Sequence, residues 1–179
     1  LGRPAEALLD LEAARRVRPD DPDARLGEGL ALSALGRRGE DVSALPGLVE
    51  EAFTSSLPLS GHERFLVVGA GRDWPTAQEA ALKLREGAFV AAEAQETEQL
   101  LHGHLAAIDE TVRAFVLEGE GRAAERAAGA AAALRELGCD TTLVPTSHPV
   151  VDVVQFQQLT LDLADTRGVD PDKIRRDEP

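Results

Sequence analysis

The chain contains a single cysteine and no methionine among its 179 residues. One cysteine, Cys139, excludes an internal disulfide framework and a thiolate metal cluster. No lysine or histidine lies close to it in the sequence, and such neighbours are what usually activate a thiol. The surrounding Leu-Gly-Cys-Asp-Thr-Thr therefore favours a small apolar residue at the entrance of a strand over a reactive thiol.

Long apolar runs and a positive charge excess are also missing. No run approaches the roughly 20 residues that a membrane span needs, so we expect no membrane partner. The chain opens on Leu1 without methionine and has no charged-then-apolar leader, so we expect a piece of a longer protein. The 19 basic residues against 32 acidic ones give a net charge of -13, which argues against nucleic acid. We expect a cytoplasmic protein whose anionic ligands, if any, meet local donors.

Two composition regimes predict two parts, a helical segment at 1–55 and an α/β domain at 56–179. In the first, Leu1-Gly2-Arg3 recurs as Leu35-Gly36-Arg37 after 34 residues, a period that is similar to the tetratricopeptide helix pair. An ordinary antiparallel helix hairpin with the same period explains the pattern equally well. A third helix is expected at 44–53, followed by a linker rich in Ser, Pro and Gly at 54–63.

The second regime alternates short apolar runs with helical stretches, which predicts parallel strands joined by helices. The run Phe65-Leu66-Val67-Val68 has no polar alternation and is typical of a strand buried on both faces. Strands are expected at 65–68, 89–94, 114–117 and 141–144, and helices at 76–86, 122–137 and 151–164. Right-handed crossovers then give a three-layer α/β/α fold with a parallel sheet. The polar tail from Gly168 onward is expected to lie over the surface.

The turn after the first buried strand is a candidate ligand site. Gly69, Gly71 and Arg72 come directly before a helix whose first turn contains Thr76. Free N–H groups at such a helix start attract anions, and glycine permits positive φ and close approach. Any strand-to-helix turn in an open α/β sheet favours glycine, however, so the turn alone is weak support for binding.

The helix that follows carries Glu79, Lys83 and Glu86 on one face, separate from its buried alanine stripe. A solvated ladder of ion pairs is the simplest interpretation of this spacing. Further on, His102 and His104 follow Glu96 and Glu98. Their spacing fits no helical two-histidine pattern, so we expect no metal site there.

From Arg64 to about Arg175 the chain resembles the sugar isomerase (SIS) family. The matching motifs are ALKLRE at 81–86, the stretch EAQETEQLLHGHLAAID at 93–109, and DLADTRGVDPDKIRR at 162–176. The similarity is to the second of the two SIS subdomains in the isomerase half of glucosamine-6-phosphate synthase. It implies an SIS-like parallel sheet of flavodoxin-like topology. The resemblance implies that Glu86 is the proton-shuttling carboxylate, His102 the ring-opening histidine, and Lys83 the lysine of the same helix.

Those residue types suit aldose–ketose chemistry. A partly desolvated carboxylate can move a proton between two carbons, and an imidazole can donate to one ring oxygen while accepting from another. A nearby cation would stabilise negative charge on an enediol-like intermediate. The resemblance implies no cofactor, and it implies a sugar phosphate as the small-molecule partner of a homo-oligomer.

The chain also departs from the family pattern. The sequence has no match for the Ser/Thr-rich loops that bind phosphate in the first SIS subdomain, or for the glutaminase domain. The tail lysine that forms an imine in the family also has no counterpart, and Arg175 and Arg176 lie near its expected place. The proline usual after His-Gly is His104. We therefore expect an isomerase-type domain that is incomplete without a second SIS subdomain or a partner subunit, and no amidotransferase activity. The alternative is a non-catalytic sugar-phosphate sensor or an interaction module on a degenerate SIS fold.

Overall fold

The computed structural model describes residues 44–173. Of these, residues 45–173 form part of one compact unit that begins at Leu45. The predicted tetratricopeptide-like pair lies outside the described residues. Helix α3 (Leu45–Ala52), which the sequence analysis assigned to the N-terminal segment, packs on the last helix of the α/β domain through Ala52, Val151 and Val154. The boundary expected between residues 55 and 56 stays a prediction.

Four parallel strands form the sheet, as the sequence predicted. They are β1 (Arg64–Gly69), β2 (Ala91–Glu96), β3 (Val112–Leu117) and β4 (Asp140–Val144). Their order in the sheet is β2-β1-β3-β4, so β1 pairs with β2 on one side and with β3 on the other. The expected three-layer α/β/α fold is confirmed.

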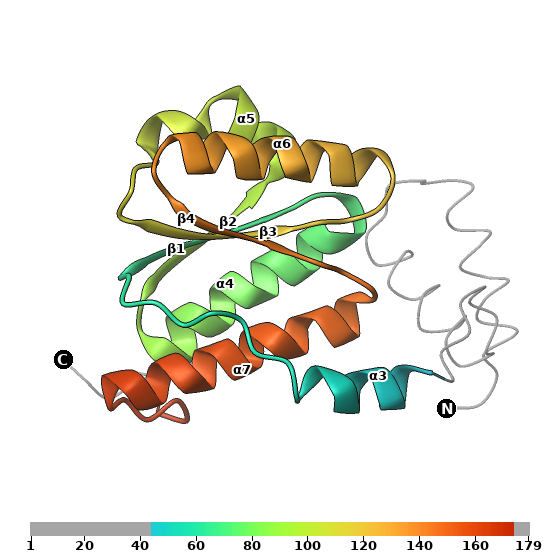
Figure 1. Cartoon of the computed structure of the whole chain (residues 1–179). Helices are drawn as coiled ribbons and strands as arrows, with labels where there is room; N and C mark the ends of the chain where they lie inside the picture. Colours follow the sequence, from blue (N-terminus) through green and yellow to red (C-terminus); the bar gives the residue numbers. More distant parts are fainter. Residues whose placement is uncertain (1–43, 174–179) are drawn as a thin grey trace, which may run out of the picture. The chain divides into compact units, whose positions relative to one another are not determined.

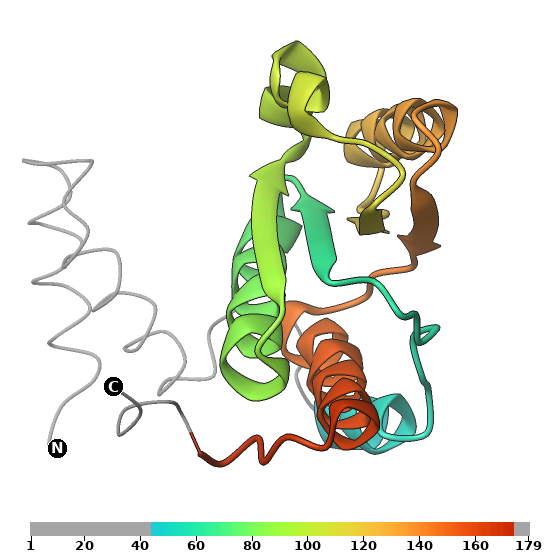
Figure 2. The ribbon, with the colours of Figure 1, turned by 90° about the vertical axis from the view of Figure 1, so that its left-hand side faces the viewer.

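Helices cover both faces of the sheet, as Figures 1 and 2 show. Helices α4 (Trp74–Ala88) and α7 (Pro149–Arg167) lie side by side on one face. The short helix α5 (Thr97–His102) and the helix α6 (Arg122–Glu136) lie on the other. Single 3₁₀ turns, η1 (Gly71–Asp73) and η2 (His104–Ala107), precede α4 and follow α5.

The central strands divide their side chains between two cores, since successive residues of a strand point to opposite faces. Phe65, Val67 and Phe115 pack beneath α4 and α7, where the Phe115 ring meets the ring of Phe156 edge to face at 5.6 Å. The alternate residues, such as Leu66 and its neighbours in β1 and β3, pack beneath α5 and α6. This is why the run 65–68 is apolar throughout.

Most element boundaries differ from the prediction by a few residues, and two differences change the element to which a residue belongs. Phe89 was expected to open the second strand, but it ends α4 in the left-handed conformation with a φ of 56°. The strand itself begins at Ala91. His102 was expected in a loop or at a helix start, and it is instead the last residue of α5. Phe89 closes α4 in a conformation that glycine more often supplies, and periodicity does not locate such an end. Gly103 follows His102 at the end of α5.

Helices α4 and α7 are in close contact at Gly87. A Cβ built on Gly87 would lie 2.5 Å from the Cγ2 methyl of Thr160 on α7. That methyl cannot turn away freely, because Thr160 is buried and its hydroxyl donates to the Phe156 carbonyl at 2.8 Å. Glycine at this position therefore sets the spacing of the two helices.

We predict that Gly87→Ala destabilises the domain by about 1–3 kcal/mol, the usual cost of overpacking a core. Gly129→Ala on α6 is the matched control, since nothing lies within 4 Å of a Cβ there and alanine favours helix. Adding Thr160→Ser, which removes the methyl and keeps the hydroxyl, should restore most of the loss. Urea unfolding measures all three; equal stability of the two glycine variants would refute the close contact.

Candidate functional site

The carboxyl ends of three strands surround an open pocket of about 510 Å³. Its lining comes from the turn after β1, the start of α5 after β2, and the start of α6 after β3: Ala70, Thr97, Glu98, Arg122, Ala123 and Arg126. Small-molecule sites typically measure roughly 300–1,000 Å³, and open parallel sheets bind ligands at this edge. Both the size and the place are those of a ligand site.

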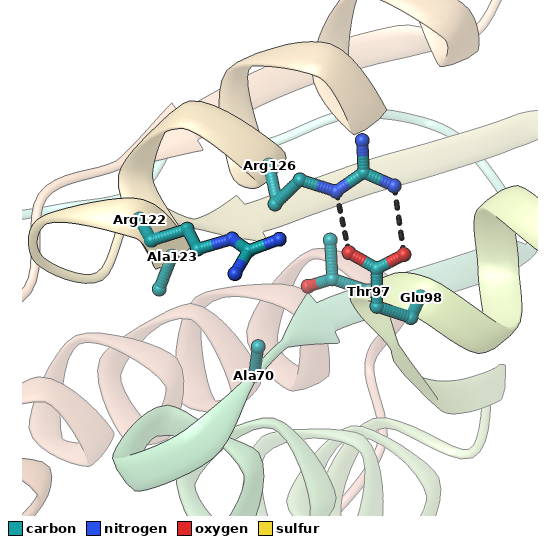
Figure 3. A pocket seen from close by; sticks show the side chains of 6 residues that line it. All are labelled: Ala70, Thr97, Glu98, Arg122, Ala123 and Arg126. Carbon is teal, nitrogen blue, oxygen red and sulfur yellow. Dashed lines mark hydrogen bonds and ion pairs between the residues drawn. The ribbon is translucent and has the colours of Figure 1, made fainter.

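An ion pair between α5 and α6 forms one wall of this pocket. The Arg126 guanidinium donates from Nε and Nη2 to the two oxygens of Glu98, the second bond measuring 2.7 Å (Figure 3). These hydrogen bonds hold the pKa of the Glu98 carboxyl below its usual value. Glu98 is placed by Glu96, whose side chain caps α5 by accepting from the Glu98 and Gln99 N–H groups. Sequence analysis missed Arg122 and Arg126; their i, i+4 spacing after a Gly-Glu-Gly turn was the available signal.

The predicted glycine turn borders the same pocket through Ala70. Gly69 is required by close approach, because a Cβ there would lie 2.8 Å from the Asp73 carbonyl oxygen. Gly71 adopts a φ of 56°, as the sequence analysis expected of a glycine in this turn. Arg72 reaches across to the loop before α7 and donates to the Ser147 carbonyl at 3.3 Å. The ligand-binding role predicted for these residues and for Thr76 remains a prediction.

Two buried carboxyl groups lie next to this turn. Asp73 is 3% exposed and Asp152 on α7 is 1% exposed. Asp152 accepts from the Ser147 N–H and hydroxyl, while Asp73 receives a hydrogen bond of 3.4 Å from the Thr146 hydroxyl. Burial, and then the charge of Asp152, raise the pKa of Asp73 above its ordinary value.

The predicted catalytic pair on α4 lies elsewhere. Lys83 contacts Glu86 at 3.1 Å and Glu79 at 3.5 Å, so the ladder of ion pairs expected from the sequence is present. The Glu86 hydrogen bond raises the pKa of Lys83. Lys83 and Glu86 line a second pocket of about 370 Å³ with residues of α7 and the segment after it, including Thr160 and Pro171.

His102 lies on the opposite face of the sheet from Glu86. Its side chain is 80% exposed and its Nε2 lies 3.6 Å from Glu98. It lines neither of the two pockets described above. The structure thus brings Lys83 and Glu86 together and leaves His102 apart from them within one copy of the domain. No group of three or more potential metal-ligating side chains gathers within residues 44–173.

The fold and the pocket define an open parallel α/β domain with a ligand-sized site at the carboxyl edge of its sheet. The SIS domain model matches residues 59–169, and the chain belongs to the SIS domain family. Within residues 44–173, every helix is too short or too polar to cross a membrane.

Curated relatives agree with this membership, and solved structures share the fold. A glutamine–fructose-6-phosphate aminotransferase (isomerizing) of Thermus thermophilus is 31% identical over 176 residues, which cover 82% of this chain and 29% of that protein. Glucosamine-6-phosphate deaminase of Thermotoga maritima shares the fold with a TM-score of 0.67 at 22% identity, over 84% of this chain and 52% of that one. The C-terminal domain of glucosamine-fructose-6-phosphate aminotransferase from Francisella tularensis shares the fold with a TM-score of 0.58 at 19% identity, over 84% of this chain and 46% of that one. The chain thus spans under a third of the length of the Thermus thermophilus relative.

The raised pKa of Asp73 leads to a pH prediction. A carboxyl whose folded pKa lies above its unfolded value costs stability as pH rises from the unfolded pKa through the folded one. Asp73→Asn should therefore stabilise the domain more near pH 7 than near pH 4, in denaturant titrations at both pH values.

Asp109→Asn is the control, because its effect on the free energy of unfolding should depend on pH in the opposite direction. Hydrogen bonds from Thr111 lower the pKa of Asp109, so its charge contributes stability that is present at neutral pH and lost on acidification. This variant should lose more stability near pH 7 than near pH 4. An Asp73→Asn effect that is independent of pH would contradict the assignment.

Proposed function

We propose that this chain is a phosphosugar-binding domain of the aldose–ketose isomerase type, whose site is completed by a second SIS subdomain or a partner subunit. The observation that carries the proposal is the ligand-sized pocket with two guanidinium groups at the carboxyl edge of an SIS fold. In a chain of net charge -13, cationic side chains gathered at such an edge suit an anionic sugar.

The roles proposed for the catalytic residues are those implied by the resemblance. Glu86 acts as the base, Lys83 stabilises the charge that develops on the substrate, and His102 assists ring opening. Glu86 is 38% exposed at its side chain and His102 is 80% exposed, so each is open to a covering surface from another subdomain. A carboxylate needs such cover, because desolvation is what raises its pKa toward the working range of a base.

The separation of Glu86 from His102 has a direct consequence for assembly. Each residue must meet the complementary group on another subdomain or subunit, since they lie on opposite faces of one sheet. We therefore propose a homo-oligomer, working in the cytoplasm, or a longer chain with both subdomains. The relatives named above are much longer than this chain, which supports the longer chain with both subdomains as well as it supports the homo-oligomer.

A non-catalytic sugar-phosphate sensor is the second candidate. The observation that favours it is the ladder of ion pairs around Lys83, which already engages the proposed base without any substrate. A sensor would use the pocket at the carboxyl edge and would not require Glu86.

The test is binding and conversion of fructose 6-phosphate and glucose 6-phosphate by the full chain in its native assembly. Saturating ligand should stabilise it by about 2–3 kcal/mol in thermal unfolding. Glu86→Gln should lower turnover by roughly 10²–10⁴-fold, as expected for loss of a general base. His102→Ala should also slow conversion of the closed-ring substrate.

Glu79→Gln is the matched control, because Glu79 contacts the same lysine but has no proposed catalytic role. It should leave turnover near the parent value. Binding without any turnover in the parent chain, together with equal binding by Glu86→Gln, would establish the sensor. An assembled protein that neither binds nor converts a sugar phosphate would eliminate both candidates.

A further inference from the structure

The start of α6 carries an arrangement of charge that stability alone does not explain. Arg122 is the first residue of this helix and Arg126 lies one turn further on. A helix N-terminus has a partial positive charge, so acidic residues are favoured there and basic ones are not. Two arginines at i, i+4 also repel each other. Cations in this position cost stability unless an anion meets them.

Only one of these two cations has an anionic partner in the part of the chain that the structure describes. Arg126 is paired with Glu98 through two hydrogen bonds, while the Arg122 guanidinium has no ion pair or hydrogen bond among residues 44–173. Arg122 acts on Glu98 only electrostatically. The turn before α6 contains Glu118 and Glu120, and neither forms an ion pair with Arg122.

Both guanidinium groups reach from α6 toward the start of α5 and into the pocket of about 510 Å³, as Figure 3 shows. Thr97 also lines this pocket, where its hydroxyl can donate to an oxyanion. Planar guanidinium groups match phosphate oxygens in a bidentate geometry, and phosphate binds readily at a helix start. A carboxylate of Glu98 already occupies the donor edge of Arg126.

We propose that Arg122 and Arg126 form a phosphate subsite, and that Glu98 is an internal carboxylate which a phosphomonoester displaces from Arg126. The subsite rests on the proposed phosphosugar function and adds to it the residues that hold the phosphate. Glu98 also lies 3.6 Å from His102, so displacement leaves this carboxylate free to pair with the histidine alone.

The experiment titrates inorganic phosphate into the full chain in its native assembly and follows binding by calorimetry. Arg122→Ala and Arg126→Ala should each weaken binding about tenfold or more, since hydrogen bonds to charged groups are the strong ones. Glu98→Gln should tighten binding, because it removes the competing charge. Arg135→Ala is the matched control: this exposed arginine lies at the other end of the same helix and donates to the Thr141 carbonyl.

A second readout reports displacement directly. The NMR signals of the Arg126 Nε–H and of the His102 ring should shift on addition of phosphate, and the His102 shift should vanish in Glu98→Gln. The proposal is overturned if phosphate does not bind, or if the Arg122 and Arg126 variants bind it as the Arg135 variant does.

Sugar phosphates separate this proposal from the function on which it rests. If fructose 6-phosphate binds and is converted equally well without Arg122 or Arg126, the subsite is wrong and the isomerase-type function stands. If phosphate binds through both arginines while fructose 6-phosphate binds no tighter and is never converted, the subsite stands and the isomerase-type function falls.

Discussion

The position of β1 in the middle of the sheet is the constraint on which the rest of the structure depends. Strand β1 pairs with β2 on one side and β3 on the other, so the chain must reverse its direction across the sheet after β2. Parallel connections are right-handed, and a reversal therefore moves the following helices to the other face. Helix α4 precedes the reversal, while α5 and α6 follow it. The same reversal leaves the turns after β1 and β3 next to each other at the carboxyl edge.

This topology decides which functional groups can act together. Groups at the carboxyl ends of β1, β2 and β3 converge, which gathers Ala70, Thr97 and Arg122 around one pocket. Groups on α4 and α5 cannot converge within one domain, because the sheet lies between them. Glu86 and His102 therefore remain apart, however well their sequence spacing agrees with the family pattern. Chemistry that needs both residues must use a second surface.

The sequence was sufficient for the layers of the fold and insufficient for the geometry of the site. The apolar run 65–68 identified a strand buried on both faces, and the glycines at 69 and 71 identified the turn that follows. Strand order is different in kind, because element spacing alone does not say on which side of β1 the third strand pairs. The expected flavodoxin-like order came from the family resemblance. Arg126 was missed because its contact, like strand order, depends on which elements lie side by side. Its partner Glu98 is 28 residues away, and the two meet only because α5 and α6 pack on the same face.

The face of α4 shows how one set of contacts can serve stability or catalysis. Lys83 between Glu79 and Glu86 forms a solvated ladder, and exposed pairs of this kind contribute only a few tenths of a kcal/mol each. Because the Glu86 hydrogen bond raises the pKa of Lys83, this lysine stays cationic and can stabilise charge but cannot serve as a base at neutral pH. Covering the face would remove water from both groups and strengthen their attraction. Thus the chemistry available to Glu86 depends less on its neighbours in α4 than on what packs against them.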